Sequence, residues 1–291
     1  MSPCGPGLSP PHYRHQVQLE FLRFRFACVA ADPIQFPRGK PGNVLRGGFG
    51  SVLHAIDHDS YAALFEPARA LDGPSGLRDP ARPFVFRAAH LDGRSIAPGE
   101  TFHFDLHLFD TTREWLDILR TAFTQLGQNG WGPSRGRVRL TGASQEAVRI
   151  RLDPAAQSVP GLSVDFITPT ELKSSGETAT EPRFHTLFSR ARDRVGRFAA
   201  ASGVDFGRLG EEARQIAMTH CDIREVHVMR RSARTGQWHP LGGFTGTAQY
   251  EGELRELLPW LDAAQSTGVG RHAAWGQGEI RIRPLPPIAR D

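Results

Sequence analysis

The chain has 291 residues, of which 39% are hydrophobic and 23% charged, and its formal net charge is +4. These values are typical of a globular protein with one large domain or two ordinary ones, and no apolar run approaches the roughly 18 residues of a membrane-spanning helix. The first residues are rich in proline and glycine and have no apolar core, which argues against a signal peptide. We therefore expect a disordered lead-in over residues 1–15 and a cytoplasmic location.

Arginine carries almost all of the positive charge, because Lys40 and Lys173 are the only lysines among the 35 basic residues. The codon bias of a GC-rich genome accounts for such a ratio, yet arginine is also the better residue for bidentate phosphate contacts. The cysteines Cys4, Cys28 and Cys221 are scattered and form neither a disulfide framework nor a CxxC metal motif. The composition alone thus leaves nucleic-acid binding open and favours a reducing compartment.

Hydrophobic periodicity divides the first half into alternating strands and helices. The expected elements are strands at 16–30, 100–109 and 137–140, and helices at 43–58 and 112–127. The second helix is expected to end at Gly127, as a helix with a glycine stop does.

After a break at Pro160–Gly161 the same order of elements begins again. The expected elements are strands at 162–169, 222–232 and 242–252, a helix at 183–201, a helix at 253–264 kinked at Pro259, and a final strand ending near 283. Each half also ends in a Trp-Gly loop followed by a strand with arginines on one face, at 130–140 and 274–283. This repeated β-α-β-β-α-β order predicts an α+β protein made of two tandem ferredoxin-like domains, at 16–158 and 159–285.

The stretch S-T-G-V-G-R-H-A-A-W-G-Q-G-E-I-R-I-R-P (266–284) holds four glycines, which raises the possibility of a nucleotide site. A dinucleotide fingerprint, however, needs a strand, then glycines, then a helix, whereas here the glycines lie between a helix and a strand. The GxxxxGK[ST] motif is absent as well. We therefore expect no nucleotide cofactor.

Three strings in the second half carry a family resemblance: G-G-F-T-G-T-A-Q-Y-E-G (242–252), L-L-P-W-L (257–261) and T-G-V-G-R-H-A-A-W-G-Q-G-E-I-R-I (267–282). Together they resemble the C-terminal signature of the CRISPR-associated RAMP superfamily, and most of all its endoribonucleases that process CRISPR repeat transcripts into guide RNAs. L-S-V-D-F-I-T-P-T-E-L-K is similar to the opening strand of that family's second domain. The resemblance covers residues 16–284.

The resemblance implies a fold, an activity and a set of partners. It implies two ferredoxin-like domains with repeat RNA along a basic cleft, and CRISPR repeat RNA or guide RNA as the partner, with other effector-complex subunits as further candidates. It also implies metal-independent cleavage, in which a ribose 2′-hydroxyl attacks the adjacent phosphate and leaves a 2′,3′-cyclic phosphate. Many relatives have a cysteine cluster after the first helix, and this chain has none there, so no structural zinc is expected.

Cleavage by a 2′-hydroxyl needs a base, an acid and positive charge, and histidine suits the first two roles. On the first expected helix His54 points away from the apolar face, among the small residues Gly47, Gly50 and Ser51. His58 lies one turn further along, and Lys40, Arg46 and Tyr61 are close in sequence. We expect His54 to be the catalytic histidine, with His58 as the alternative and Lys40 and Arg46 as supporting cations.

Two other interpretations of these histidines stay open. Both can be ordinary solvated side chains, or His54 and His58 can hold a metal ion together with Asp57 or Asp59, although the sequence offers no further ligand at clear spacing. His103 and His107 share the polar face of a strand, and we expect them to face solvent.

The predicted RNA-binding residues cluster on the two glycine loops, the strands that follow them and the basic helix of the second half. They are Arg135, Arg137, Arg139, Arg190, Arg194, Gly268, Gly270, Arg271, His272, Gly276, Gly278 and Arg281. His272 can instead be catalytic or an ordinary loop residue. Trp131 and Trp275 can stack on bases, but we expect them to support their loops from beneath.

Three functions are compatible with this pattern. The first is a repeat-specific endoribonuclease, and the second is an inactive subunit of the same fold that holds guide RNA inside an effector complex. The third is an RNA-binding tandem ferredoxin-like protein outside CRISPR systems, which the two matching glycine loops disfavour.

Overall fold

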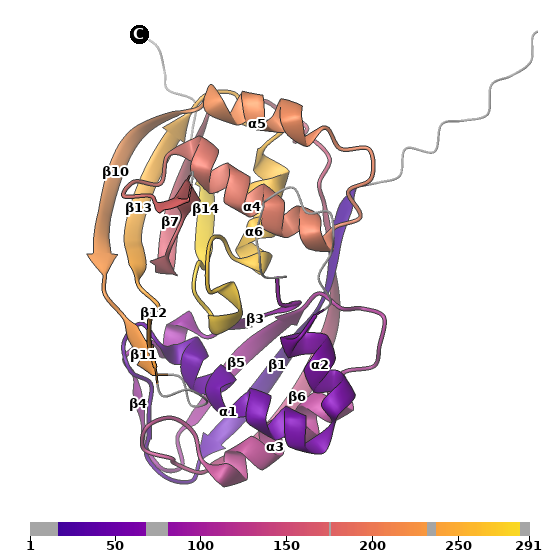
Figure 1. Cartoon of the computed structure of the whole chain (residues 1–291), viewed down its shortest axis with the longest axis vertical. Helices are drawn as coiled ribbons and strands as arrows, with labels where there is room; N and C mark the ends of the chain where they lie inside the picture. The colour runs from indigo at the N-terminus through magenta and orange to yellow at the C-terminus, as the bar shows by residue number, and fades with distance from the viewer. Residues whose placement is uncertain (1–16, 68–80, 175, 232–236, 286–291) are drawn as a thin grey trace, which may run out of the picture.

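The computed structural model describes residues 17–67, 81–174, 176–231 and 237–285. The expected lead-in at 1–15 lies outside this part of the chain. Two four-stranded antiparallel sheets dominate the structure, one from each half of the sequence, and each carries helices on one face (Figure 1). None of the helices in these ranges is long and apolar enough to cross a membrane.

The first sheet has the strand order β3-β5-β1-β6. Its elements are β1 (Gln18–Ala30), α1 (Pro41–Ile56), α2 (His58–Phe65), β3 (Phe84–Arg87), β5 (Thr101–Leu108), α3 (Leu116–Asn129) and β6 (Val138–Arg151), with a short pair β2 (Ile34–Gln35) and β4 (Ser95–Ile96) and a 3-10 turn η1 (Ala89–Leu91). In order of appearance the four main strands are thus arranged 2-3-1-4.

The second sheet repeats this arrangement, with the order β10-β13-β7-β14. Its elements are β7 (Gly161–Thr170), α4 (Phe184–Phe198), α5 (Phe206–Arg214), β10 (Ala217–Val226), β13 (Gly243–Glu251), α6 (Leu258–Thr267), η2 (Ala273–Trp275) and β14 (Ile280–Pro284), with the short pairs β8 (Lys173–Ser174) with β9 (Glu177–Thr178) and β11 (Met229–Arg231) with β12 (Trp238–Pro240). Both halves therefore have the βαββαβ topology, and the prediction of tandem ferredoxin-like units is confirmed.

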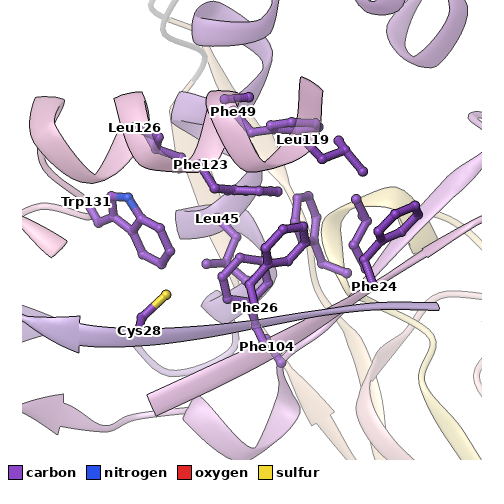
Figure 2. Packing of buried hydrophobic residues seen from close by; sticks show 14 of the residues in the cluster. Phe24, Phe26, Cys28, Leu45, Phe49, Phe104, Leu119, Phe123, Leu126 and Trp131 are labelled. Carbon is purple, nitrogen blue, oxygen red and sulfur yellow. The ribbon is translucent and has the colours of Figure 1, made fainter. Parts of the chain in front are cut away.

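Aromatic rings fill the core between the first sheet and its helices. Alternation along β1 directs Phe24 and Phe26 toward α1 and α3, where the ring of Phe123 lies 4.5 Å from that of Phe26 (Figure 2). Phe49 of α1 stacks on Phe123 at 4.8 Å. Because these rings bury large apolar areas, they account for much of the stability of this half.

The opposite face of the first sheet packs against the second half of the chain. Leu19 and Phe21, which alternate with Phe24 and Phe26 in direction, belong to the second hydrophobic core together with Val85. The ring of Phe109 stacks on Phe198 of α4 at 4.6 Å. The two halves thus share an apolar interface.

Two expected helix ends and one expected kink are wrong. Gly127 lies inside α3, where a side chain would collide with the carbonyl oxygen of Val138. Gly130 ends the helix instead. Pro259 stands in the first turn of α6 and does not kink it, because proline needs no hydrogen-bond partner there. His58 does not continue α1, because Asp57 caps a new helix, α2.

Candidate nucleic-acid interface and cleavage site

His54 and His58 lie together on an exposed corner between two helices. The Asp57 side chain accepts hydrogen bonds from the backbone amides of Asp59 (3.1 Å) and Ser60 (3.2 Å), which starts α2 directly after α1. As a result the rings of His54 and His58 are 5.0 Å apart, and Tyr61 lies 4.8 Å from His54. Two imidazoles and a phenol therefore share one surface.

The surface of α1 beside this histidine cluster (His54, His58 and Tyr61) is partly open. Gly47 and Ser51 are exposed along α1, whereas Gly50 lies under the ring of Phe65 and does not join the open surface. Arg113, which the sequence analysis missed, donates to the hydroxyl of Ser60 at 2.9 Å. No sequence motif marks Arg113, because it lies in the loop before α3 and contacts the buried Ser60 from another part of the chain.

Asp57 is committed to its capping role. Hydrogen bonds from the Ser60 hydroxyl and backbone lower the pKa of this carboxyl group, and Arg113 adds to the effect. Within the described ranges no group of three or more His, Cys, Asp or Glu side chains is arranged to hold a metal ion. The imidazoles of His54 and His58 are groups that can take up and release protons at this corner.

Lys40 and Arg46 lie toward the other end of α1. Lys40 immediately precedes the helix, so the rise of 1.5 Å per residue puts it about 21 Å from His54, and Arg46 about 12 Å from it. The Arg46 guanidinium is stacked 3.3 Å from the centre of the Trp275 ring. The structure therefore does not bring all four expected catalytic residues to one phosphate; it groups Lys40 and Arg46 with the glycine loop.

The glycine loop, residues 268–279, packs tightly against protein backbone. A side chain on Gly270 would collide with the carbonyl oxygen of Glu171, and one on Gly278 with that of Val269. All four glycines, Gly268, Gly270, Gly276 and Gly278, have φ between 68° and 78°, a region that favours glycine. These contacts explain the glycines by backbone packing; RNA contact by the loop remains a prediction.

Arg271 and His272 surround a buried carboxylate at the tip of the loop. Oε1 of Glu171 lies 2.9 Å from Nη1 of Arg271 and 3.6 Å from Nζ of Lys173. Its Oε2 lies 3.7 Å from Nε2 of His272. His272 has φ 63°, which is uncommon for a residue other than glycine. Glu171 was missed because a single acid in a strand-to-strand turn gives no signal.

The arginines of the first glycine loop and its strand are exposed, but they differ in their contacts. Arg137 is paired with Asp32 at 2.7 Å, and this pairing raises the pKa of the guanidinium. Arg135 Nη2 donates to the Asn129 carbonyl at 3.3 Å, and Arg139 is exposed. Trp131 is buried beneath the loop, as expected of a supporting side chain.

The arginines of the second half divide into exposed and buried ones. Arg281 is exposed, and Arg283 beyond it is bound to Asp165 at 2.9 Å. Arg190 lies 3.8 Å from Asp193 on α4. Arg194, expected to bind RNA from the basic helix, is instead largely buried, and it donates to the Thr267 carbonyl at 2.6 Å. Helical periodicity does not reveal that the first sheet covers this side of α4.

His107 is also largely buried, contrary to the expectation that it faces solvent. Its Nδ1 donates to the Ser266 carbonyl at 3.1 Å. Burial lowers the pKa of His107 to about 3, and the positive charge of Arg87 acts in the same direction. The alternation that put His107 on the polar face of β5 was correct, but α6 covers that face.

Family models match both halves of the chain. A model described as an N-terminal domain matches residues 19–157, and the model of the CRISPR-associated endoribonuclease Cas6 matches residues 164–280. The CRISPR-associated endoribonuclease Cas6 of Mycobacterium tuberculosis (strain CDC 1551 / Oshkosh) is 26% identical over 129 residues, which are 43% of this chain and 39% of that protein. The match thus spans about two fifths of the curated relative.

Solved structures share the fold at low sequence identity. Thermus thermophilus Cas6 superposes with a TM-score of 0.56 and 15% identity over 91% of this chain and 99% of that one. A Cas6 product complex superposes with a TM-score of 0.60 and 15% identity, over 90% of this chain and 100% of that one. A chain of a partial Cas6-RT-Cas1–Cas2 complex superposes with a TM-score of 0.59 and 12% identity, over 94% of this chain and 47% of that one.

Proposed function

We propose that this chain is a CRISPR-associated endoribonuclease of the Cas6 family, which binds CRISPR repeat RNA and cleaves the precursor transcript into guide RNAs. The observation that carries the choice of site is the exposed pair of imidazoles, His54 and His58, with ring centres 5.0 Å apart. An acid and a base on one surface are what strand cleavage by a 2′-hydroxyl requires.

In this mechanism one imidazole removes the proton from the 2′-hydroxyl, whose oxygen forms a bond to the adjacent phosphorus. The bond from phosphorus to the 5′-oxygen breaks, and the other imidazole donates a proton to that leaving oxygen. The products are a 2′,3′-cyclic phosphate and a 5′-hydroxyl. The Tyr61 hydroxyl is the nearby group that can stabilise the charge on the phosphorane.

The rest of the RNA would extend from this corner toward the glycine loop. Lys40 and Arg46 lie along α1 in that direction, and Arg271 is exposed at the tip of the loop. Guanidinium and ammonium groups spaced along one surface suit successive phosphates of a single strand. In this proposal these residues bind and the histidine cluster cleaves. The substrate would be a transcript, so we propose a cytoplasmic location.

The test is single-turnover cleavage of a repeat RNA in EDTA by the whole chain. We expect cleavage, its loss when the scissile ribose carries a 2′-deoxy substitution, and rates lowered about 10²- to 10⁴-fold in His54→Ala and in His58→Ala. The matched control is His220→Ala, a change of an exposed histidine on β10, which should cleave at the wild-type rate. Full activity in both cluster variants, with loss in His272→Ala, would move the chemistry to the glycine loop.

The second candidate is an RNA-binding subunit that does not cut. It is favoured by the distance of about 21 Å between Lys40 and His54, since that spacing leaves the histidine cluster without the cations of the glycine loop. Tight binding of intact repeat RNA by the wild-type chain, with no cleavage, would support this candidate and refute the enzyme. Other CRISPR subunits would then be its partners.

A further inference from the structure

Three basic side chains meet the C-terminal end of α6, directly before the glycine loop. The last carbonyl groups of a helix have no partner within the helix. Here Arg87 Nη2 donates to the Gln265 carbonyl at 2.6 Å, His107 Nδ1 to that of Ser266 at 3.1 Å, and Arg194 Nε to that of Thr267 at 2.6 Å. Three consecutive carbonyls are thus satisfied by three different elements.

Arg87 contacts both ends of the glycine loop. Before the loop it holds Gln265, and after the loop its Nη1 lies 3.7 Å from Oε2 of Glu279. Arg87 belongs to β3, the edge strand of the first sheet, whereas both of its partners belong to the second half. The side chain therefore joins the halves at the position where the loop leaves α6 and where it enters β14.

Between these two anchors the loop passes the edge of the first sheet and reaches α1. Gln277 Nε2 donates to the Gly39 carbonyl at 2.8 Å, and the carbonyl of Trp275 packs against Gly42 in the first turn of α1. A side chain on Gly276 would lie 3.4 Å from the Phe86 carbonyl, next to Arg87 on β3. Any shift of the anchors would thus move the loop relative to Lys40 and Arg46.

The charges of this cluster have an energetic cost. Burial lowers the pKa of Arg87, opposed by Glu279, and burial together with the charge of Arg87 lowers the pKa of Arg194 to about 9. Arg87 and Arg194 are both largely buried, the carboxylate near Arg87 is that of Glu279, and Nε and Nη1 of Arg87 have no hydrogen-bond partner. The negative end of the α6 dipole offsets part of this cost. An apolar residue would pack here at lower cost, so the arrangement is better explained by positional specificity.

We propose that Arg87, with His107 and Arg194, is a positioning residue that holds the glycine loop in the conformation that binds RNA. This inference rests on the proposed function for the identity of the ligand. Its physical basis is preorganisation: a loop already ordered loses less conformational freedom when it binds. Loosening the anchors should then weaken RNA binding without changing the chemistry at the distant histidine cluster.

The first arm of the test measures amide hydrogen exchange without RNA. The reporters are the hydrogen-bonded amides of Val269, Arg271 and Gly278. We expect their exchange to be at least tenfold faster in Arg87→Gln and near the wild-type rate in Arg87→Lys, which keeps a charged donor. The matched control is Arg25→Met, which removes an exposed arginine of the same sheet bound to Asp105. Unchanged exchange in Arg87→Gln would overturn the proposal.

The second arm measures binding and cleavage of repeat RNA by the whole chain. With RNA made uncleavable by a 2′-deoxy scissile ribose, Kd should rise about tenfold in Arg87→Gln, while the cleavage rate at saturating protein stays within threefold. An equal loss of rate, or a wild-type Kd despite faster exchange, would refute a positioning role in binding. If the wild-type chain bound no repeat RNA, the proposed function would fail, and the exchange arm would still decide how the loop is held. If Arg87→Gln did not fold, His107→Leu would replace it in both arms of the test. His107→Asn, which keeps an amide donor, would then be the matched control.

Discussion

His107 provides a direct test of the buried interface, through the pH dependence of stability. Burial, with the charge of Arg87, lowers the pKa of this imidazole to about 3, against an ordinary value of 6.5 in an unfolded chain. Below pH 6.5 the unfolded chain therefore binds a proton that the folded chain does not. The contribution of His107 is complete above that pH and is lost as the pH falls toward 3.

The size of the effect follows from the two pKa values. One pH unit between them is worth about 1.4 kcal/mol, so lowering the pH from 7 to 5 should remove about 2 kcal/mol from the free energy of unfolding through His107 alone. Urea denaturation at both pH values, followed by tryptophan fluorescence, measures this loss. His107→Asn, which keeps a donor for Ser266, should lose about 2 kcal/mol less than the wild type.

The control for this experiment is His220→Asn, a change of an exposed histidine, which should show the same pH dependence as the wild type. Other groups also titrate between pH 7 and pH 5, but their contributions cancel when the variants are compared. If His107→Asn and the wild type lost equal stability within about 0.5 kcal/mol, the imidazole would be accessible to protons and the assigned burial would be wrong.

Three further predictions follow from packing and charge. Gly42→Ala should lower the melting temperature, because the added methyl group collides with the Trp275 carbonyl. Gly47→Ala, on the open side of α1, should instead stabilise the protein by about 0.5–1 kcal/mol. Calorimetry that found equal melting temperatures for the two variants would contradict the contact between Gly42 and Trp275. Phe123→Ala should cost about 3–5 kcal/mol in urea denaturation, since the ring packs against several others, and a loss below about 1 kcal/mol would refute its central position. Arg281→Ala should reduce the slope of log Kd against log salt for repeat RNA by about 0.7, and an unchanged slope would remove Arg281 from the phosphate contacts.

Much of the fold could be predicted because its signals are local. The alternation in β1 and β5 and the apolar stripe of α4 predicted these elements within a few residues. Two of the predictions that failed, at Asp57 and Pro259, have local causes, whereas the failure at Gly127 involves a contact from another part of the chain. Gly127 has no room for a side chain because the neighbouring strand β6 approaches it inside the helix, and no local signal indicates that approach.

The candidate site was predicted in part, for the same reason. His54 and His58 were singled out by spacing, and the structure keeps them together even though they belong to different helices. Lys40 and Arg46 were grouped with them because they are close in sequence, but a straight helix separates its ends by its length. Their partner is Trp275 and the glycine loop, which lie more than 200 residues later in the chain.

By itself, the sequence determined the repeated βαββαβ order, the two glycine loops and the exposed pair His54 and His58, because periodicity and turn residues act over a few positions. Only the tertiary structure decided which charged residues are buried. Arg194 and His107 have polar patterns along their own elements, and they lose solvent only because the second half packs on the open face of the first sheet. Burial of a charge depends on what covers it, and the covering residues are distant in the chain.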